Sequence, residues 1–319
     1  MAALLVAAAG PALAADSDFN GRWDIKTIQP QPRAWWVELN GVGTASPSGR
    51  FVSAYGGAMN DINTITVSNG ELRFVIIPPA SRGGRETQNK EEPRLGPYVY
   101  TARLVSGKLE GAFTREGQTT PPVRWTGVRA PAITDKDDGA WKEGKPIALF
   151  NGKDLSGWQP LHRDVEMKWS VVDGILRNAP PTTDILTTQK FWNFKLHVDF
   201  RIVEHSNSGI GLRGRYEVQI MDDYGRPPNT HGAGALYSRI IPSVNASKPP
   251  GEWQSYDIRL VGRQVTVVFN GIKVIDKGEV EGLTAIAENA DEGEPGPFIL
   301  QGDHSYVEVK NFVVTPLTR

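Results

Sequence analysis

The residues from Asn207 to Gly225 bring a carboxylate, an amide and a guanidinium together at spacings that suit the binding of sugar hydroxyls. The pattern predicts two adjacent strands that share a tight turn. Because successive side chains of a strand point to opposite faces, Glu217 and Gln219 share the face opposite Tyr216. Arg213 lies across the turn and can join the same polar group. The alternative is that these side chains are ordinary solvated residues, since antiparallel sheets commonly present one polar face to water.

A second candidate group lies near the end of the chain, which contains five histidines. Asp303 and His304 follow a predicted strand that ends at Gln301, where a loop residue can project over the sheet. We predict that His304 is a general base or acid and that Asp303 orients it. Gln301 alternates with the apolar Leu300, so we expect it on the same concave face as Glu217. The alternative for His304 is a histidine in a surface loop.

Three further features are candidates for ligand contacts. His231 precedes Tyr237 in a glycine-rich loop, where it can bind the sugar or cap a turn. Asp222-Asp223 and the run from Asp291 to Glu294 offer hard oxygen ligands for calcium or magnesium. The alternative is that these acidic clusters are solvated loops. A bound ion could act as a Lewis acid during catalysis.

Composition narrows the class of protein. The chain has 319 residues, enough for two domains of ordinary size, and a formal net charge of -1. We expect no nucleic-acid partner, because the sequence shows neither a basic excess nor a basic run. The 34 glycines, 23 prolines and nine tryptophans, spread among short alternating apolar runs, predict a turn-rich all-β protein. The sequence has no cysteine, which excludes disulfides, thiolate metal sites and a catalytic thiol.

The first 15 residues are predicted to be a secretory signal peptide. An apolar run up to Ala9 is broken at Gly10-Pro11, and Ala12 to Ala15 provides small residues for cleavage. The apolar run is too short to span a bilayer, and no later segment approaches the required length. We therefore expect a periplasmic or secreted protein without a membrane span.

Two domains are predicted after the signal peptide. Residues 19–130 begin with Gly21-Arg22-Trp23 and continue as short strands, a pattern that resembles a small lipocalin-like β-barrel. Residues 131–146 are charged and turn-forming, as expected for a linker. Residues 147–319 contain the hairpin signals Asp173-Gly174 and Asn270-Gly271 between apolar runs. Short antiparallel strands without an amphipathic helix predict a two-sheet sandwich with a concave ligand face.

The motifs of the second domain occur in a recognisable order. They are Leu149–Trp158 (LFNGKDLSGW), Asn207–Gln219, His231–Tyr237 (HGAGALY), Pro249–Ile258 (PPGEWQSYDI), Asn270-Gly271 and Gly296–Leu317. Together they resemble the 3-keto-disaccharide hydrolase domain family over essentially the whole domain. The resemblance implies a concanavalin-like jelly-roll fold and cleavage of a glycosidic bond in a sugar already oxidised to a ketone at carbon 3. It also implies a sugar dehydrogenase that oxidises carbon 3 and supplies the substrate.

The residues favour this chemistry over ordinary glycoside hydrolysis. Retaining glycosidases use two carboxylates about 5 to 5.5 Å apart, but the alternate positions of this strand hold Glu217 and the amide Gln219. A ketone at carbon 3 acidifies the hydrogen on carbon 2, so one base can abstract it. The aglycone then leaves carbon 1 by elimination, and water adds later. We expect Glu217 or His304 as the base and Arg213 or a metal ion as the stabiliser of the enolate. Substrate contacts are expected from Gln219, Gln301, Asp303, His231 and Tyr237.

Three other functions stay open at this point. The second domain could be a conventional glycoside hydrolase, or a carbohydrate-binding module without catalysis, because a fold does not fix a function. A third alternative is an envelope interaction protein, which would show a large exposed apolar patch and no polar cleft. An acid or base group within hydrogen-bond reach of a sugar distinguishes an enzyme from both kinds of binding protein.

Overall fold

The computed structural model describes residues 14–28, 32–53, 58–77 and 96–319, which fall into two compact units. The first unit contains most of the described chain up to Arg129, and the second contains Ala130–Arg319 with two short earlier pieces. Most of the predicted signal peptide lies outside the described residues. Within the described residues, no helix is both long and apolar enough to cross a membrane.

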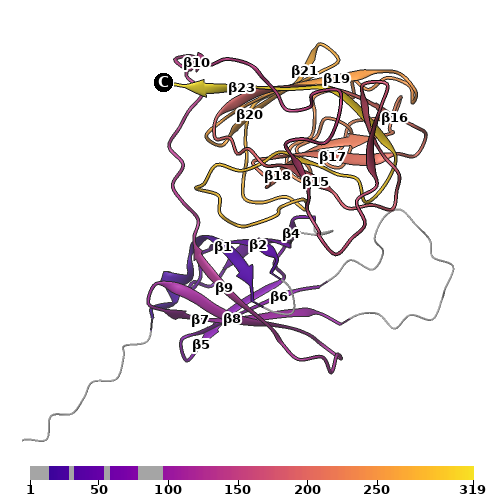
Figure 1. Cartoon of the computed structure of the whole chain (residues 1–319). Helices are drawn as coiled ribbons and strands as arrows, with labels where there is room; N and C mark the ends of the chain where they lie inside the picture. The colour runs from indigo at the N-terminus through magenta and orange to yellow at the C-terminus, as the bar shows by residue number, and fades with distance from the viewer. Residues whose placement is uncertain (1–13, 29–31, 54–57, 78–95) are drawn as a thin grey trace, which may run out of the picture. The chain divides into compact units, whose positions relative to one another are not determined.

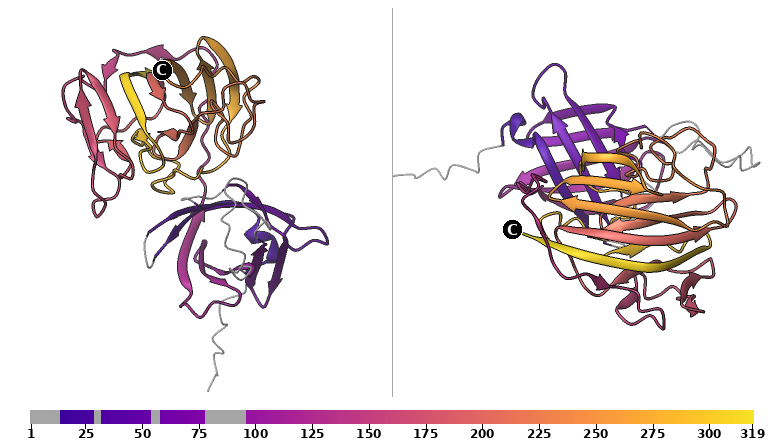
Figure 2. Two further views of the ribbon diagram at one scale, coloured as in Figure 1. Left: turned by 90° about the vertical axis from the view of Figure 1, so that its right-hand side faces the viewer. Right: turned by 90° about the horizontal axis from the view of Figure 1, so that it is seen from above.

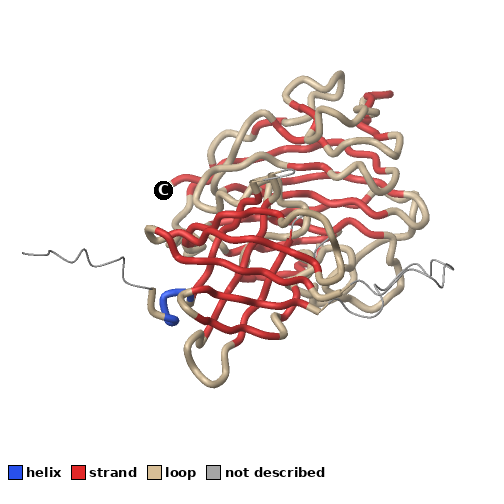
Figure 3. The backbone as a smooth tube through the Cα atoms, turned by 90° about the horizontal axis from the view of Figure 1, so that it is seen from below, coloured by secondary structure: helices blue, strands red, loops and turns tan. Residues whose placement is uncertain are grey.

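The first unit contains one nine-stranded antiparallel sheet (Figures 1 and 3). Its first strand, β1 (Gly21–Thr27), pairs with its last, β9 (Val123–Arg129), and the other recorded pairs join strands that are consecutive in the chain. Between them come β2 (Ala34–Asn40), β3 (Ser48–Ser53), β4 (Asn60–Asp61), β5 (Thr64–Ser68), β6 (Glu71–Ile76), β7 (Tyr98–Val105) and β8 (Lys108–Arg115). Pairing of the first strand with the last is typical of up-and-down barrels. The likeness to lipocalins stays a prediction.

Aromatic side chains form much of the core of this sheet. Trp23, from the Gly-Arg-Trp start, is buried, and its indole N–H donates a hydrogen bond to the carbonyl of Phe19 over 2.9 Å. Trp125 is also buried, and the rings of Phe74 and Tyr100 stack with centroids 4.6 Å apart. Large buried rings of this kind stabilise a small sheet through the apolar area that they remove from water.

The second unit is a sandwich of two antiparallel sheets, seen as two layers in Figures 1 and 2. The larger sheet runs in the order β13 (Trp169–Val172), β14 (Ile175–Asn178), β23 (Val307–Thr318), β16 (Phe194–Ile202), β19 (Gln254–Val261), β20 (Gln264–Phe269) and β21 (Ile272–Glu279). The smaller sheet runs in the order β12 (Trp158–Pro160), β15 (Ile185–Thr187), β22 (Ile299–Leu300), β17 (Asn207–Leu212) and β18 (Tyr216–Met221). The predicted all-β jelly-roll sandwich is confirmed.

The hydrophobic core lies between these two sheets. On β16 the alternate residues Leu196, Val198 and Phe200 are buried, and they belong to the same apolar cluster as Ile210 and Val218 of the smaller sheet. Burying an aliphatic or aromatic side chain of this size stabilises the fold by about 1.5–3 kcal/mol. One face of each strand is therefore fixed toward the core, and the residues between these positions must point outward.

Residues 131–146 are not the free linker that their composition predicts. The carboxylate of Asp135 accepts hydrogen bonds from the Trp192 indole (2.8 Å) and the Asn193 amide (2.9 Å). Asp137 accepts two hydrogen bonds from the guanidinium of Arg259, at 2.8 and 2.9 Å. The segment also supplies β10 (Lys142–Glu143), which pairs with the end of β23, and the chain continues into β11 (Ile147–Ala148). Its acidic residues therefore anchor the chain to the larger sheet, a role that charge content alone does not reveal.

This anchor gives a testable difference between two neighbouring aspartates. Asp137→Asn should lower the free energy of unfolding by about 1–2 kcal/mol, because the two-pronged ion pair with Arg259 is lost. Asp138→Asn, at an exposed position one residue away, is the matched control and should leave stability unchanged. Arg259 lowers the pKa of Asp137, so the stabilisation is present above the ordinary value of 3.8 and is lost as the pH falls below it. Urea titrations at neutral and acidic pH measure both effects, and equal stability of the two variants would contradict the anchor.

Candidate active site

On the outer face of the smaller sheet, one row of paired positions crosses four strands and carries three polar side chains. Gly209 of β17 pairs with Gln219 of β18, and the backbone N–H of Gln301 donates to the carbonyl of Gly209 over 3.0 Å. Asp184 and Gln301 occupy corresponding positions at the ends of β15 and β22. The row is therefore Asp184, Gln301, Gly209 and Gln219, on the side of the sheet that does not face the core.

Glu217 lies in the next row of paired positions, and its side chain extends over Gly209 in the first row. It pairs with Gly211, and a Cβ atom built on Gly209 would lie 2.5 Å from its carboxylate Oε1. Gly209 thus leaves the space that the Glu217 side chain fills, whereas the space beside Gly211 is taken by Ile299 and Ile286. The backbone N–H of Glu217 donates to the Thr284 hydroxyl over 2.9 Å, which fixes the strand under the side chain. Glu217 is 3% exposed.

Burial dominates the acid–base chemistry of Glu217. Within the described part of the chain, no group donates a hydrogen bond to its carboxylate. Loss of water around the charged form raises the pKa of Glu217 to about 8. The charge of His304 lowers the pKa of Glu217, whereas the negative charges of Asp184 and Asp303 raise it further. A carboxyl group with such a pKa is a much stronger base, once ionised, than an exposed glutamate.

His304 is paired with its sequence neighbour. Its Nδ1 is hydrogen-bonded to the carboxylate of Asp303, as expected for an orienting partner. This hydrogen bond raises the pKa of His304 above its ordinary value of 6.5, burial opposes the rise, and the charges of Asp184 and Glu217 add to it. The His304 side chain is 47% exposed, so the cluster extends from the surface to the buried Glu217. The other ring nitrogen, Nε2, can then exchange a proton with a ligand.

Asp184 is the site residue that the sequence prediction missed. It is 6% exposed, and its Oδ1 accepts backbone hydrogen bonds from Gly302 (2.8 Å) and Asp303 (3.2 Å). Burial, followed by the charge of Asp303, raises the pKa of Asp184 to about 6. The signal was available in the alternation: Ile185 belongs to the core, so the residue before it points to the outer face. A second carboxylate thus reaches Glu217 from another strand.

The side-chain amide oxygens of Gln219 and Gln301 have no hydrogen-bond donor among the described residues. The side-chain N–H of Gln219 donates to the carbonyl of His231 over 3.2 Å, which leaves its Oε1 buried without a hydrogen-bond partner. Oε1 of Gln301 is buried and unpartnered as well. A buried polar group without a partner costs about 1–3 kcal/mol. These acceptors, beside three carboxylates, favour a ligand that is rich in hydrogen-bond donors, such as a polyol.

His231 and Tyr237 lie at the border of the site. Residues around Ala235 run beside the edge strand β18, with backbone hydrogen bonds from Gln219 to Ala235 (3.0 Å) and from Tyr237 to Glu217 (2.9 Å). Tyr237 is therefore the neighbour of Glu217 in the sheet. The His231 ring packs edge-on against Tyr237 with centroids 4.7 Å apart, and burial lowers the pKa of His231.

Arg213 does not join the cluster, in contrast to the prediction. It occupies the hairpin turn with a positive φ of 52°, which takes its side chain out of the strand alternation. Its guanidinium is fully buried, stacks on the Trp192 ring at 3.8 Å and donates hydrogen bonds to the carbonyls of Trp192 and Gly262 and to the side chain of Asn193. Arg213 thus ties the turn to the rest of the sandwich through all three of its guanidinium nitrogens, away from the cluster around Glu217.

Three of the predicted metal ligands, Glu292, Asp222 and Asp223, are bonded to protein groups. Glu292 is fully buried and pairs with Arg263 over 2.6 Å. Asp222 accepts the backbone N–H of His205 over 2.7 Å, and Asp223 accepts that of Ala233 over 2.9 Å. Among the residues that the structure describes, no three His, Cys, Asp or Glu side chains are grouped to hold an ion. A calcium or magnesium site therefore stays a prediction from the sequence.

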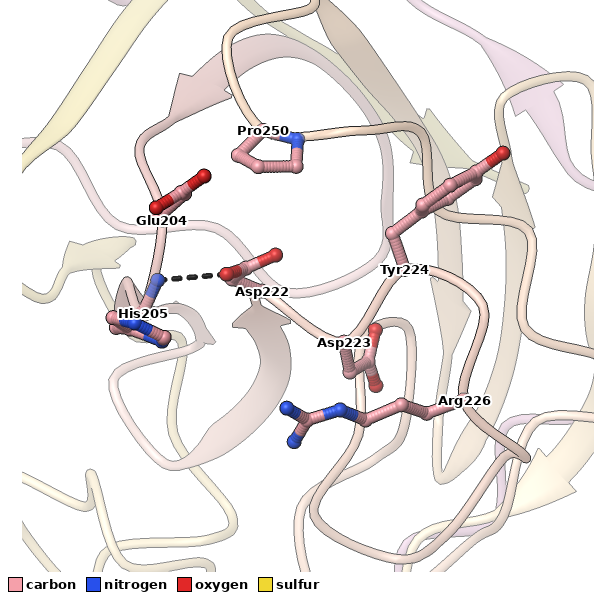
Figure 4. Close-up of a pocket in the computed structure, with 7 residues that line it drawn as sticks. All are labelled: Glu204, His205, Asp222, Asp223, Tyr224, Arg226 and Pro250. Carbon is pink, nitrogen blue, oxygen red and sulfur yellow. Dashed lines mark hydrogen bonds between the residues drawn. The ribbon is translucent and has the colours of Figure 1, made fainter.

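A pocket of about 310 Å³ lies beyond the end of β18 (Figure 4). It is lined by Glu204, His205, Asp222, Asp223, Tyr224, Arg226 and Pro250. Figure 4 shows the hydrogen bond between His205 and Asp222 across one wall. Among the residues that the structure describes, the buried side-chain oxygens without a hydrogen-bond partner include those of Gln219 and Gln301 but none from the lining of this pocket.

Fold and site together define a jelly-roll protein with an acid–base cluster on the outer face of its smaller sheet. Residues 145–315 match the family described as the 3-keto-alpha-glucoside-1,2-lyase-like domain, and the chain belongs to this family. The resemblance inferred from the sequence motifs is confirmed.

Individual relatives are more distant. A protein of Bacteroides thetaiotaomicron named 3-keto-disaccharide hydrolase is 24% identical over 148 residues, covering 35% of this chain and 51% of the relative. The chain thus spans about half the length of this curated relative. Two solved structures from Parabacteroides distasonis, each described as a candidate glycosyl hydrolase, are 28% and 24% identical, with TM-scores of 0.47 and 0.43. They cover 62% and 53% of this chain and 94% and 92% of their own chains.

The structural role of Arg213 can be separated from a catalytic one. Arg213→Lys should lower the free energy of unfolding by about 2–4 kcal/mol, because two of its charged hydrogen bonds cannot be remade by a single ammonium group. The exposed Arg226→Lys is the matched control. Thermal and urea unfolding measure the difference. A variant at Arg213 that is as stable as the parent but inactive would place this residue in the chemistry after all.

Glu217→Gln should stabilise the protein at alkaline pH. The pKa of Glu217 rises from an ordinary value of 4.5 to about 8 in the folded state, so the stability it contributes is complete below 4.5 and is lost as the pH rises through about 8. Glutamine has no charge to bury. The stability advantage of the variant should therefore grow by on the order of a few kcal/mol between about pH 5 and about pH 9. Glu252→Gln, at an exposed position, is the control, and an advantage that does not change with pH would refute the raised pKa.

Proposed function

We propose that the protein cleaves glycosides that carry a ketone at carbon 3, by removal of the carbon-2 proton and elimination of the aglycone. The observation that carries this proposal is the buried carboxyl group of Glu217, which interacts electrostatically with His304 and receives no hydrogen bond from the described residues. The proposed setting is the periplasm or the cell exterior. The substrate would come from a sugar dehydrogenase that oxidises carbon 3.

Glu217 is the proposed base and His304 the proposed acid. Proton abstraction from carbon is efficient when the pKa of the base lies near the working pH, and burial brings the pKa of Glu217 to about 8. Asp303 favours the protonated form of His304, which suits a group that donates a proton. Each group stabilises the charged form of the other, so the active pair is a carboxylate beside an imidazolium.

The proposed reaction balances with these two residues. Glu217 takes the proton from carbon 2, and the electron pair moves onto the ketone oxygen as an enolate. The enolate re-forms the ketone, the bond from carbon 1 to the aglycone oxygen breaks, and His304 protonates that oxygen. Water then adds to the double bond between carbons 1 and 2, with neutral His304 as base and protonated Glu217 returning the proton to carbon 2. Both residues end in their starting forms, and the net change is hydrolysis.

The row of amides supports sugar binding beside this pair. The unpartnered Oε1 atoms of Gln219 and Gln301 can accept hydrogen bonds from ring hydroxyls. With Arg213 committed to the turn, the amide N–H of Gln301 is the proposed neutral donor to the enolate oxygen. A carbohydrate-binding module without catalysis would not need a partner-free carboxyl group with a raised pKa, which favours an enzyme.

Asp184 supports a second candidate function, conventional glycoside hydrolysis. Glu217 and Asp184 are two carboxyl groups whose environments set different pKa values, about 8 and about 6. Such a pair is also the arrangement of a general acid and a nucleophile or base in a glycosidase. The two candidates differ in their substrates, since only elimination requires the ketone at carbon 3.

Loss of either member of the pair should slow turnover of a 3-keto-glycoside without unfolding the protein. Glu217→Gln and His304→Ala should each lower kcat by about 100 to 10,000-fold, the usual cost of removing a positioned acid or base. Asp222→Asn, a carboxylate at the far end of β18, is the matched control. A panel of 3-keto-glycosides and their unoxidised parents measures rate and specificity together. Efficient cleavage of the parents would return conventional hydrolysis to first place.

Solvent deuterium should mark the carbon that loses its proton. In deuterium oxide, the proton that Glu217 returns to carbon 2 is deuterium whenever its carboxyl group exchanges with solvent before water adds, so the free sugar should gain deuterium at that carbon. Mass spectrometry and proton NMR of the product measure its position, and a substrate deuterated at carbon 2 should be cleaved more slowly. Product that retains hydrogen at carbon 2, together with equal rates for the two substrates, would contradict elimination and is the expected result for direct hydrolysis.

A further inference from the structure

The loop that carries His304 is fastened to the start of β15 and to β14. Oδ1 of Asp184 accepts the backbone N–H groups of Gly302 and Asp303, at 2.8 and 3.2 Å. From the other side, the amide of Asn178 donates to the carbonyls of Gly302 (2.9 Å) and Ser305 (2.8 Å). Every residue from 302 to 305 except His304 therefore has a backbone group bonded to Asp184 or Asn178.

Close packing removes the remaining freedom of this loop. A Cβ atom on Gly302 would lie 2.5 Å from the ring of Trp169, so the backbone rests directly on the indole. The indole N–H of Trp169 in turn donates to the carbonyl of Thr183 over 2.8 Å, one residue before Asp184. The His304 side chain thus stands on a loop whose position is set by β15.

Asp184 also acts on His304 through its charge. It is 6% exposed and lies at the end of the row, beside Gln301, from which the loop begins. The charged groups that face His304 are Asp303, Asp184 and Glu217, and all three stabilise its imidazolium form. Asp303 does so by a direct hydrogen bond, whereas the recorded hydrogen bonds to the Asp184 carboxylate come from the backbone of the loop, and its charge acts on His304 without direct contact.

We propose that Asp184 is a positioning residue with two separable roles: its Oδ1 fixes the loop that aims His304 at the substrate, and its charge holds His304 in the protonated form that donates to the leaving group. The proposal rests on the proposed function of His304 as the acid. Asp184 itself exchanges no proton with the substrate in this account.

Two substitutions separate the roles. Asp184→Asn keeps an oxygen that can accept both backbone hydrogen bonds but removes the charge, whereas Asp184→Ala removes both. In the full chain without substrate, NMR titration of the His304 ring should show a pKa lower by on the order of 0.5–1 unit in Asp184→Asn. Asp222→Asn is the matched control, because its carboxylate also accepts one backbone N–H, at the far end of β18, and it should leave the titration unchanged.

Turnover of a 3-keto-glycoside tests the positioning role. Asp184→Asn should keep kcat at the optimum within about tenfold while the alkaline limb of its pH profile moves to lower pH, as the NMR titration does. Asp184→Ala should lower kcat by a further 10-fold or more and shift the backbone signals of Gly302 and Asp303. An unchanged His304 titration in Asp184→Asn would overturn the charge role. Unchanged loop signals in a folded Asp184→Ala would overturn the positioning role. The His304 titration and the loop signals are measured without substrate, so these two outcomes stand apart from any failure of the proposed reaction.

Discussion

The burial of the Glu217 carboxyl group over Gly209, with no hydrogen bond from the described residues, is the constraint on which the site depends. Taking an ionised carboxylate out of water is unfavourable, so the group holds its proton to a pH far above its ordinary range. An exposed glutamate at the same position would be fully ionised but a weak base. The same environment that destabilises the folded protein at alkaline pH thus makes the group useful for abstracting a proton from carbon.

The sandwich maintains this unfavourable arrangement from three directions. The core between the sheets fixes Tyr216 and Val218, so Glu217 has to point to the outer face. Gly209 leaves the space that its side chain fills, and Thr284 bonds to the backbone beneath it. The cluster is completed by residues far apart in the chain, because β15, β22 and β17 are neighbours in the smaller sheet. Apolar burial distributed over the whole sandwich offsets the local cost.

Sequence patterns predicted the fold and the side-chain directions of residues on regular strands. They failed at residues whose position is set by tertiary contacts. The alternation in β18 correctly placed Glu217 and Gln219 opposite the core, and the motif order identified the family. Arg213 was misplaced because a turn residue with positive φ leaves the strand alternation, and its partners at Trp192 and Gly262 are distant in sequence. The acidic segment 131–146 looked like a linker for the same reason.

Asp184 shows what a closer use of the same pattern could have found. The strand that it precedes has only three residues, too few for alternation to be noticed in isolation. Its pairing with β22, which brings Asp184 level with Gln301, is fixed by hydrogen bonds that no local pattern contains. The site is therefore readable from the sequence strand by strand, but its assembly into one row requires the sheet order.

The titration of the Glu217 carboxyl carbon tests the central claim most directly. Carbon-13 NMR of selectively labelled protein, with Glu217→Gln to assign the signal, follows this one group through its ionisation in the absence of substrate. The structure predicts a midpoint at about 8, with the protonated form dominant at neutral pH. A midpoint near the ordinary value of 4.5 would contradict the account, because Glu217 would then be an ordinary carboxylate and the site would lack the base that the proposed elimination requires.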